Sequence, residues 1–340
     1  MDTDVSMEIH DKKNQVRTQV GVVVIGRNEA ARLQSTLRAV MSAEVPLIYV
    51  DSRSQDDSVE LARNLGVEVI VLSEDNPVNA SRARNEGAKA LMEKFPQLRY
   101  LQFLDGDTTL ESGWLGAAFM DLEANSEVAF VCGQLREKDR EENIYRCLCD
   151  MEWRWEATEN AEPCRLGGMG MMRISVYVSS GGYDETLIAG ADPELYARLA
   201  QAGWILHVLP LIMGIHDSGM QSFRQWWIRS VKTGFGFANG LATGAWGRER
   251  RSAILWGGGL PLVSIVGAIV ITGWILLLLL MYPLNSYRIW TSSVKREFSQ
   301  NDRWLYASSC MVSKIPQFIG IVKYHWRSLT RQTTSVIQYK

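Results

Sequence analysis

Five consecutive segments between residues 20 and 72 alternate between two kinds of sequence. Three are short runs rich in valine and isoleucine, and the two between them carry apolar residues at helical spacing. The order is strand 20–26, helix 28–43, strand 46–52, helix 56–66 and strand 67–72. Continuous apolar strands separated by amphipathic helices form parallel sheets that are covered on both faces. This pattern predicts a doubly wound α/β unit.

The following residues extend this unit, although the alternation becomes less regular. Expected helices are at 79–94, 112–124 and 143–160, and expected strands are at 99–104, 128–135, 166–174 and 204–216. In doubly wound sheets, ligands bind at the carboxyl ends of the strands. Four polar residues follow predicted strands at such ends: Arg27, Asn28, Asp51 and Asp105.

The segment FLDGDT at 103–108 places two carboxylates, Asp105 and Asp107, on either side of a glycine at a strand end. One interpretation is an ordinary turn, because aspartate and glycine are common turn residues. The other is a site for a divalent cation and a phosphate, because Mg²⁺ or Mn²⁺ prefers oxygen ligands and would relieve the repulsion between the carboxylates. The pattern by itself leaves both open.

Composition narrows the classes of function. The 340 residues include 36 lysines and arginines against 38 aspartates and glutamates, so nothing in the total charge indicates a nucleic-acid partner. The five cysteines have no CxxC spacing, which indicates reduced thiols in a cytosol. Residues 1–18 are polar and lack the apolar run of a secretory signal. We therefore expect a flexible N-terminal tail and a cytoplasmic catalytic domain.

The C-terminal third has a different character. Residues 221–252 combine Arg and Lys with Trp and Phe, which favours an amphipathic helix at a membrane interface. The stretch 254–283 has no charge, and 30 residues exceed the roughly 20 that cross a bilayer. We therefore expect a membrane segment at 253–283 and a basic, helical, membrane-proximal region at 284–340.

Two topologies are compatible with the membrane segment: a single tilted span, or a re-entrant hairpin. Basic residues flank it on both sides, and such residues stay on the cytoplasmic face of a membrane. A hairpin broken near Pro261, Gly267 or Gly273 would keep both flanks on that face, which favours the hairpin. A single span would place one basic flank on the opposite face.

An ordered series of motifs resembles glycosyltransferase family 2, whose members have the GT-A fold and use nucleotide sugars. The series covers about residues 20–240 and reads VVVIGRNEA, YVDSRSQDDS, NASRARNEGAKA, FLDGDT, GGYDETL with AGADPEL, and IHDSGMQSFRQWW. Each motif is short, but their order is that of the family. The resemblance implies a Rossmann-like GT-A domain at 19–220, followed by the membrane-associated helical region.

The resemblance also implies roles on the donor side. Asp107 would bind Mg²⁺ or Mn²⁺, and Asp105 would contact ribose or a water near the cation. His216 would complete the metal or diphosphate site; alternatively, it is only a polar residue at a strand end. Arg27, Asn28 and Asp51 would contact the nucleotide. Ser52 and Arg53 stand where many members have an aspartate and a glycine, so this loop departs from the family pattern.

Further roles concern the sugar and the acceptor. Arg84 matches the family's ARN element and would hold the first aspartate loop or a phosphate; alternatively, it is a surface arginine. Gly167 and Gly168 match a glycine pair that lines the sugar and acceptor site. Asp192 aligns with the catalytic base, although the glutamate that usually precedes it is Ala191 here. Asp192 could instead be only a helix cap before Pro193.

These observations predict a metal-dependent, inverting glycosyltransferase. It would transfer a sugar from a nucleotide sugar to a lipid-linked or glycan acceptor, for polysaccharide biosynthesis at the cytoplasmic face of the cell envelope. Two alternatives remain open. One is a nucleotidyltransferase-like enzyme that activates a sugar phosphate, and the other is an inactive membrane scaffold of the same fold.

Overall fold

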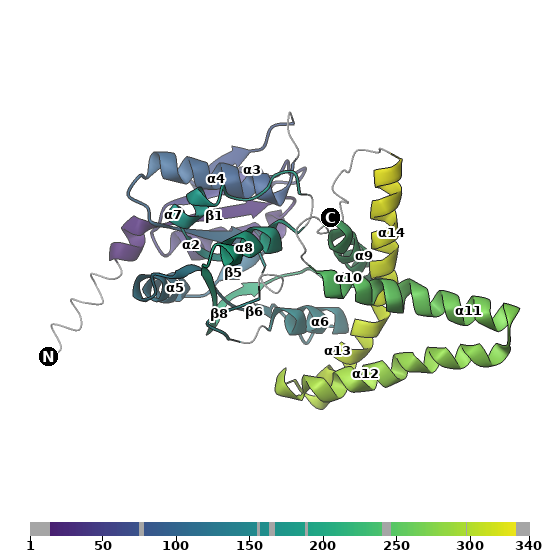
Figure 1. Ribbon diagram of the computed structural model, residues 1–340. Helices are drawn as coiled ribbons and strands as arrows, with labels where there is room; N and C mark the ends of the chain where they lie inside the picture. The colour runs from purple at the N-terminus through teal and green to yellow at the C-terminus, as the bar shows by residue number, and fades with distance from the viewer. Residues whose placement is uncertain are drawn as a thin grey trace. The chain divides into compact units, whose positions relative to one another are not determined.

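The computed structural model describes residues 14–74, 78–154, 157–162, 167–187, 190–239, 246–296 and 298–330 (Figure 1). The chain divides into two compact units. Unit 1 contains residues 1–138, 155–187 and 191–218, and unit 2 contains 139–154, 188–190 and 219–340. Residues 14–19 are helical and Val16 is buried, so this described part of the predicted flexible tail at 1–18 is ordered. Residues 1–13 of that prediction lie outside the described residues.

Unit 1 is built on one sheet with the strand order β3-β2-β1-β4-β7-β6-β8-β5. The first four strands along the chain pair in parallel, as predicted: β1 (Val20–Gly26), β2 (Leu47–Asp51), β3 (Glu68–Val71) and β4 (Tyr100–Asp105). This arrangement brings the carboxyl ends of β1, β2 and β4 to one edge.

The second half makes the sheet mixed; the parallel arrangement was predicted only for the first hundred residues. The remaining strands are β5 (Thr108–Leu110), β6 (Val128–Glu137), β7 (Gly170–Arg173) and β8 (Ile205–His216). β7 runs antiparallel to both β4 and β6, and β5 runs antiparallel to β8, while β6 and β8 are parallel. Because β5 follows β4 after only two residues and pairs with β8, it places Thr108 opposite His216.

Besides the helical residues 14–19, the helices of unit 1 within the described residues are α2 (Ala30–Met41), α3 (Ser58–Asn64), α4 (Ala80–Lys94), α5 (Trp114–Ala124), α7 (Ile174–Ser179) and α8 (Ala191–Gln201). Asn79 caps α4, because its side-chain oxygen accepts a hydrogen bond from the Arg82 amide at 2.9 Å. Gly87 lets α4 lie directly on the sheet: a methyl group there would come within 2.5 Å of Val23. The packing of α4 fixes Arg84 and Asn85 at the sheet edge.

Unit 2 is helical. Its elements are α6 (Ile144–Trp153), α9 (Phe223–Asn239), α10 (Gly247–Ile254), η2 (Leu255–Gly259), α11 (Leu260–Val270), η3 (Gly273–Leu280), α12 (Met281–Ser292), η4 (Ser293–Arg296), α13 (Gln300–Val312) and α14 (Lys314–Leu329). α6 ends at Trp153, well before the predicted residue 160, and it groups with unit 2. Residues 240–245 of the predicted interfacial region lie outside the described residues.

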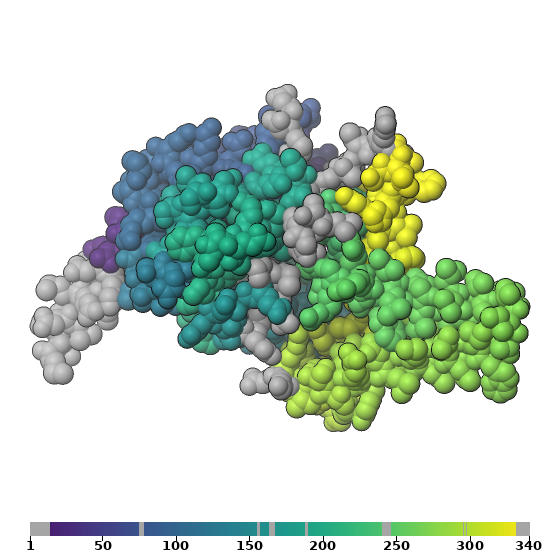
Figure 2. Space-filling view, in the orientation of Figure 1, coloured from purple at the N-terminus to yellow at the C-terminus, as the bar shows by residue number. Residues whose placement is uncertain are grey.

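The uncharged stretch of unit 2 folds back on itself. α11 ends at Val270, and η3 begins at Gly273 after a turn at residues 271–272. The two arms then lie side by side (Figures 1 and 2), and a methyl group on Gly267 would come within 3.0 Å of Ile275. The segment therefore has the geometry of a hairpin.

Helices α9 and α14 approach each other at two glycines. A Cβ atom on Gly234 would overlap the carbonyl oxygen of Gln317, and one on Gly320 would overlap that of Val231. Because both obstacles are backbone atoms, they cannot move without shifting a helix. Such close crossings through small residues are common where apolar helices pack without large side chains between them.

We predict that Gly320→Ala destabilises unit 2, since the added methyl group must push α14 away from α9. The cost expected for overpacking is about 1–3 kcal/mol. Gly259→Ala is the matched control, because its methyl group would meet nothing closer than a carbonyl oxygen at 3.5 Å. Thermal unfolding of the full chain in detergent, followed by circular dichroism, measures both variants. Equal stability of the two would contradict the close crossing.

Candidate active site

The loops after β1 and β2 are joined by hydrogen bonds at the carboxyl edge of the sheet. Asn28, with a positive φ of 56°, accepts a bond from the Gln55 amide through Oδ1, and its own amide donates to Ser54 Oγ at 2.8 Å. Asp51 is fully buried and accepts bonds from Tyr49 and from both the amide and the hydroxyl of Ser54. Asn28 and Asp51 thus shape the floor of one loop cluster.

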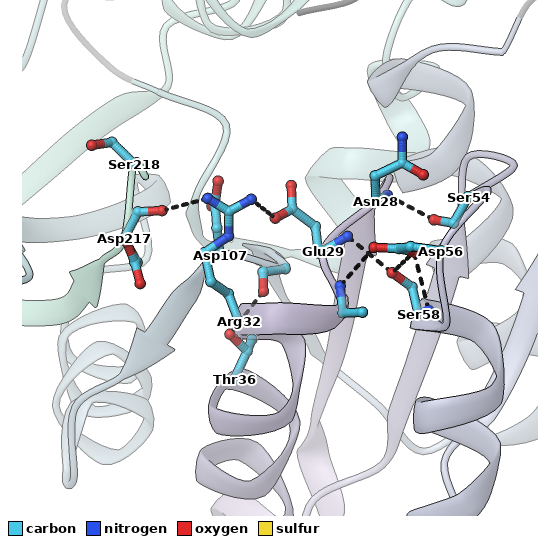
Figure 3. A network of polar contacts seen from close by, with 12 residues as sticks. Asn28, Glu29, Arg32, Thr36, Ser54, Asp56, Ser58, Asp107, Asp217 and Ser218 are labelled. Atoms are coloured by element: carbon cyan, nitrogen blue, oxygen red, sulfur yellow. Dashed lines mark hydrogen bonds and ion pairs between the residues drawn. The ribbon is translucent and has the colours of Figure 1, made fainter. Parts of the chain in front are cut away.

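A second set of bonds joins the start of α2 to the same loop (Figure 3). Asp56 accepts bonds from the Ala30 amide at 3.0 Å and from the Ser58 amide and hydroxyl. Ser58 Oγ in turn accepts a bond from the Glu29 amide at 2.9 Å. Burial opposes the charge of Asp56, but these hydrogen bonds outweigh it and lower the pKa of its carboxyl group. Asp56 is therefore an ionised anchor of the loop.

Arg32 on α2 joins this loop cluster to the end of β8. Its guanidinium pairs with Glu29 at 2.7 Å and donates to the carbonyl oxygen of Asp217 at 3.2 Å (Figure 3). One turn later, the hydroxyl of Thr36 donates to the carbonyl oxygen of Gly106 at 3.0 Å. One helix thus positions both the turn between Asp105 and Asp107 and the segment after His216.

The centre of the site is a buried arginine between two carboxylates. Arg84 contacts Asp105 Oδ1 and Asp192 Oδ1, each at 3.1 Å, and its guanidinium lies 5.3 Å from the ring centroid of Tyr183. The three residues come from α4, the end of β4 and the first turn of α8. Arg84 is only 4% exposed, so it is not the surface arginine of the alternative interpretation.

The charges at this centre change the ionisation of its members. Burial would lower the pKa of Arg84, but the carboxylates of Asp192 and Asp105 outweigh it and raise that pKa. Burial also raises the pKa of Asp105; Arg84 opposes the shift, while Asp107 and Asp192 add to it. The Asp105 side chain keeps 37% of its surface exposed, yet the crowded carboxylates disfavour its charged form. A further cation would relieve this repulsion.

Gly168 contacts the same ion pair. A Cβ atom on Gly168 would overlap the guanidinium of Arg84 and lie 2.5 Å from Asp192 Oδ1. Gly167, its neighbour, accepts a hydrogen bond from the hydroxyl of Tyr196 at 2.9 Å through its carbonyl oxygen. The predicted glycine pair therefore lies at the site, and Gly168 provides the space in which Arg84 reaches both carboxylates.

The second pair of the site is Asp107 and His216. The distance from His216 Nε2 to Asp107 Oδ1 is 3.8 Å, and His216 Nδ1 lies 2.7 Å from Glu137 Oε2. The other oxygen of Glu137 accepts bonds from the amide and hydroxyl of Ser218. A carboxylate can only accept, so Nδ1 donates to Glu137, and a neutral imidazole then directs its Nε2 lone pair to the side of Asp107.

This arrangement fits a divalent cation that is held partly by substrate. Among the described residues, no group of three or more His, Cys, Asp or Glu side chains forms a complete metal cage. Mg²⁺ is commonly bound by one or two carboxylates together with substrate phosphates. Asp107 and His216, with His216 oriented by a buried carboxylate, match such a partial ligand set.

The loop before α8 is held by Asn85. Its side-chain amide donates to the Tyr183 carbonyl oxygen and to Glu185 Oε1, and its Oδ1 accepts bonds from the Tyr183 amide and the Tyr177 hydroxyl. The adjacent Arg84 makes the contact with Asp192, so two consecutive residues of α4 position the loop and the first turn of the following helix. Asp192 therefore has an ion pair beyond the helix-cap role that was left open.

The structure thus brings most of the predicted site residues together. Arg84, Asp105, Gly168 and Asp192 form one cluster, and Asp107 with His216 forms the neighbouring pair. Arg27 is half-buried directly after β1. Sequence reasoning missed three residues: Glu137, Ser218 and Arg32. The sequence signal available for Glu137 was a glutamate at the end of an apolar strand. Arg32, in contrast, resembles any helix-surface arginine.

Residues 21–177 match the family model described as glycosyl transferase family 2. Pre-mycofactocin glycosyltransferases from two strains of Mycobacterium tuberculosis are each 26% identical to the chain over 220 residues. The matched region covers 62% of this chain and 45% of those relatives, so the chain spans less than half of their length.

The fold is similar to that of a mannosyltransferase from Pyrobaculum calidifontis, solved in complex with GDP-mannose and Mn²⁺. The TM-score is 0.57 with 16% identity, over 91% of this chain and 88% of that one. At this identity the likeness concerns the fold alone. Together with the match to the family model, these findings show that residues 21–177 form a glycosyltransferase family 2 domain and that unit 1 has the GT-A fold.

Proposed function

We propose that the chain is a metal-dependent, inverting glycosyltransferase that passes a sugar from a nucleotide sugar to a lipid-linked or glycan acceptor at the cytoplasmic face of a membrane. The observation that carries this proposal is the ion pair network at the sheet edge. Arg84 holds Asp105 and Asp192 within 3.1 Å, beside the pair of Asp107 and His216. This proximity supports a reaction in which Asp107 serves the donor and Asp192 serves the acceptor.

On the donor side, Asp107 and His216 would hold Mg²⁺ or Mn²⁺ together with the diphosphate. When bound, the cation stabilises the negative charge that develops on the leaving nucleoside diphosphate. Arg27, Asn28 and Asp51 border the loop cluster that would receive the nucleotide. The mannosyltransferase with a similar fold was solved in complex with GDP-mannose and Mn²⁺, which supports this class of donor.

On the acceptor side, Asp192 is the catalytic base. It takes the proton of the acceptor hydroxyl while that oxygen forms a bond to the anomeric carbon of the donor. The bond from the anomeric carbon to the phosphate oxygen breaks, and the nucleoside diphosphate leaves with the electron pair. Arg84 keeps Asp192 oriented through the first turn of α8, and Gly168 leaves the room for it.

The helices of unit 2 support the proposed acceptor class. Among the described residues, two helical stretches, Gly247–Val270 and Gln300–Leu329, are long and apolar enough to cross a membrane by length and composition. A membrane-bound enzyme meets acceptors that are themselves lipid-linked or membrane-proximal. The basic flanks of the uncharged stretch favour the cytoplasmic face, where nucleotide sugars are made available.

The direct test measures the release of UDP, GDP or dTDP from a panel of nucleotide sugars. Membranes that contain the chain are supplied with Mn²⁺ or Mg²⁺, and membranes without it are the blank. One donor class should be turned over, and EDTA should abolish the turnover. The absence of turnover with every donor, together with unchanged nucleotide binding in Asp107→Ala, would contradict the proposed glycosyltransferase activity.

We predict that Asp192→Asn lowers kcat by about 10²- to 10⁴-fold, because it removes the base while keeping the shape of the side chain. Donor binding should change little. Glu194→Gln is the matched control, since Glu194 lies in the same first turn of α8 and pairs with Arg198 instead. Single-turnover kinetics with the preferred donor separate the chemical step from binding. Equal losses in both variants would argue against a base at residue 192.

We predict that Glu137→Gln weakens Mn²⁺ binding about 10- to 100-fold, because an amide no longer fixes the tautomer of His216. The readout is the affinity for Mn²⁺ in the presence of nucleoside diphosphate, measured by electron paramagnetic resonance, independently of turnover. Asp107→Asn should weaken binding at least as much. Glu142→Gln, in unit 2, is the control and should bind normally. Normal Mn²⁺ affinity in Glu137→Gln would contradict the positioning role.

We predict that Gly168→Ala reduces both stability and turnover, since the methyl group displaces Arg84 from Asp192. The loss in the free energy of unfolding should be about 1–3 kcal/mol. Gly116→Ala on α5 is the control, because its methyl group would meet nothing within 4 Å. Thermal unfolding and donor turnover measure the two effects. Turnover equal to that of Gly116→Ala would show that Arg84 tolerates displacement.

A further inference from the structure

The hairpin of unit 2 exposes apolar side chains over its whole circumference. Of the described side chains of α11 and η3, only Ser264 is buried. Exposure is greatest around the turn, where Ile269, Val270, Ile271 and Trp274 keep 74–79% of their surface accessible. A helix that docks on another protein needs one apolar face, whereas a segment that is apolar all round is suited to lipid.

Two hydroxyl groups of the hairpin are satisfied internally. The hydroxyl of Ser264 donates to the Leu260 carbonyl oxygen at 2.7 Å, and the hydroxyl of Tyr282 donates to the Trp256 carbonyl oxygen. Charged residues occur only outside the hairpin, with Arg251 before and Arg288 after it. In hydrocarbon, unsatisfied polar groups cost several kcal/mol each, so this pattern is compatible with insertion.

Without the charged helix α10, the first arm is shorter than a bilayer, and the uncharged part of the second arm is short as well. The first arm contains the five residues of η2 and the eleven of α11, which reach about 24 Å at 1.5 Å per residue. The second arm begins with the eight residues of η3, which reach about 16 Å at 2.0 Å per residue. The hydrocarbon core of a bilayer is about 30 Å thick. Met281–Leu284 of α12 lengthen the second arm by only about 6 Å, so the uncharged segments 255–270 and 273–284 are both shorter than this core.

An aromatic and basic cluster lies where the second arm ends. The rings of Trp290 and Trp304 stack at a centroid distance of 5.0 Å, and Tyr287 stacks on Trp290 at 5.6 Å. The guanidinium of Arg303 lies 4.4 Å from the centroid of a Trp290 ring. Tryptophan, tyrosine and arginine of this kind are enriched at the level of lipid headgroups. The cluster marks the depth at which the hairpin would leave the membrane.

The other long apolar stretch, Gln300–Leu329, has a different environment. Helix α14 of this stretch packs against α9 at Gly320. In the most apolar part of Gln300–Leu329, 39% is buried inside the protein, compared with 17% for Gly247–Val270. Burial also lowers the pKa of Lys314 in this stretch. These contacts make Gln300–Leu329 a packing helix of unit 2, and leave the hairpin as the surface that faces lipid.

We propose that residues 255–284 form a monotopic anchor that enters one leaflet of an anionic bilayer from the side of its basic flanks and does not cross it. Residues 269–274 lie deepest, and the cluster of Tyr287, Trp290, Arg303 and Trp304 lies at the headgroups. This inference refines the membrane placement in the proposed function. It does not depend on the donor chemistry, because the anchor can be tested without any nucleotide sugar.

The first experiment is flotation of the full chain with vesicles of phosphatidylcholine and phosphatidylglycerol. Ile271→Glu should lower the partition into vesicles by at least about 50-fold, because a charge is placed at the deepest point. Val178→Glu is the matched control: it is 58% exposed, lies in unit 1, and should float like the unaltered chain. Equal flotation of the two variants would overturn the anchor, as would self-association of the unaltered chain without vesicle binding.

The second experiment determines whether the hairpin crosses the bilayer. Single cysteines at Ser252 and Ser292, on the two flanks, are labelled with an impermeant maleimide after the chain has been added to sealed vesicles. A monotopic anchor predicts that both flanks react from the outside to the same extent. Labelling of one flank only after the vesicles are opened would show a span and overturn the proposal. Circular dichroism confirms that each variant is folded, and failure of glycosyl transfer would leave both readouts intact.

Discussion

Charge compensation at Arg84 is the interaction on which the rest of unit 1 depends. Three carboxylates, Asp105, Asp107 and Asp192, converge at one edge of the sheet, and such crowding is unfavourable without cations. One arginine, buried under the loop before α8, offsets two of them. The carboxylate that Arg84 does not contact is Asp107, which lies beside His216. Its negative charge would attract a divalent cation. The same electrostatic problem thus explains why Arg84 is buried and where the cation site is expected.

The backbone is arranged to keep this compensation rigid. α4 lies close to the sheet at Gly87, which fixes the depth of Arg84, and Gly168 removes the side chain that would separate Arg84 from Asp192. Asn85 holds the loop that precedes α8, and Arg32 and Thr36 hold the turn around Gly106 and the segment after β8. Because these contacts join elements distant in sequence, the site is assembled only by the complete fold of unit 1.

This dependence also shows how much the sequence could predict. The parallel strands β1 to β4 were predicted because apolar runs and helical periodicity are local signals, and the site residues were predicted because they belong to motifs of a known family. The antiparallel pairing of β7 with β4 and of β5 with β8 was not predicted, because pairing partners are chosen by contacts far along the chain. Glu137 was missed for the same reason: its role exists only because β6 and β8 lie side by side.

The departure at Ala191 can be understood from the same charge balance. Members of the family usually have a glutamate before the catalytic aspartate, and Ala191 is 8% exposed in this chain. A glutamate at this buried position would add a further carboxylate near a centre where, among the described residues, Arg84 already pairs with two carboxylates. Burying a charge without a partner is costly, so such a glutamate would require an additional cation or a more open site. The alanine is therefore consistent with a compact centre in which Arg84 supplies the compensation for Asp192.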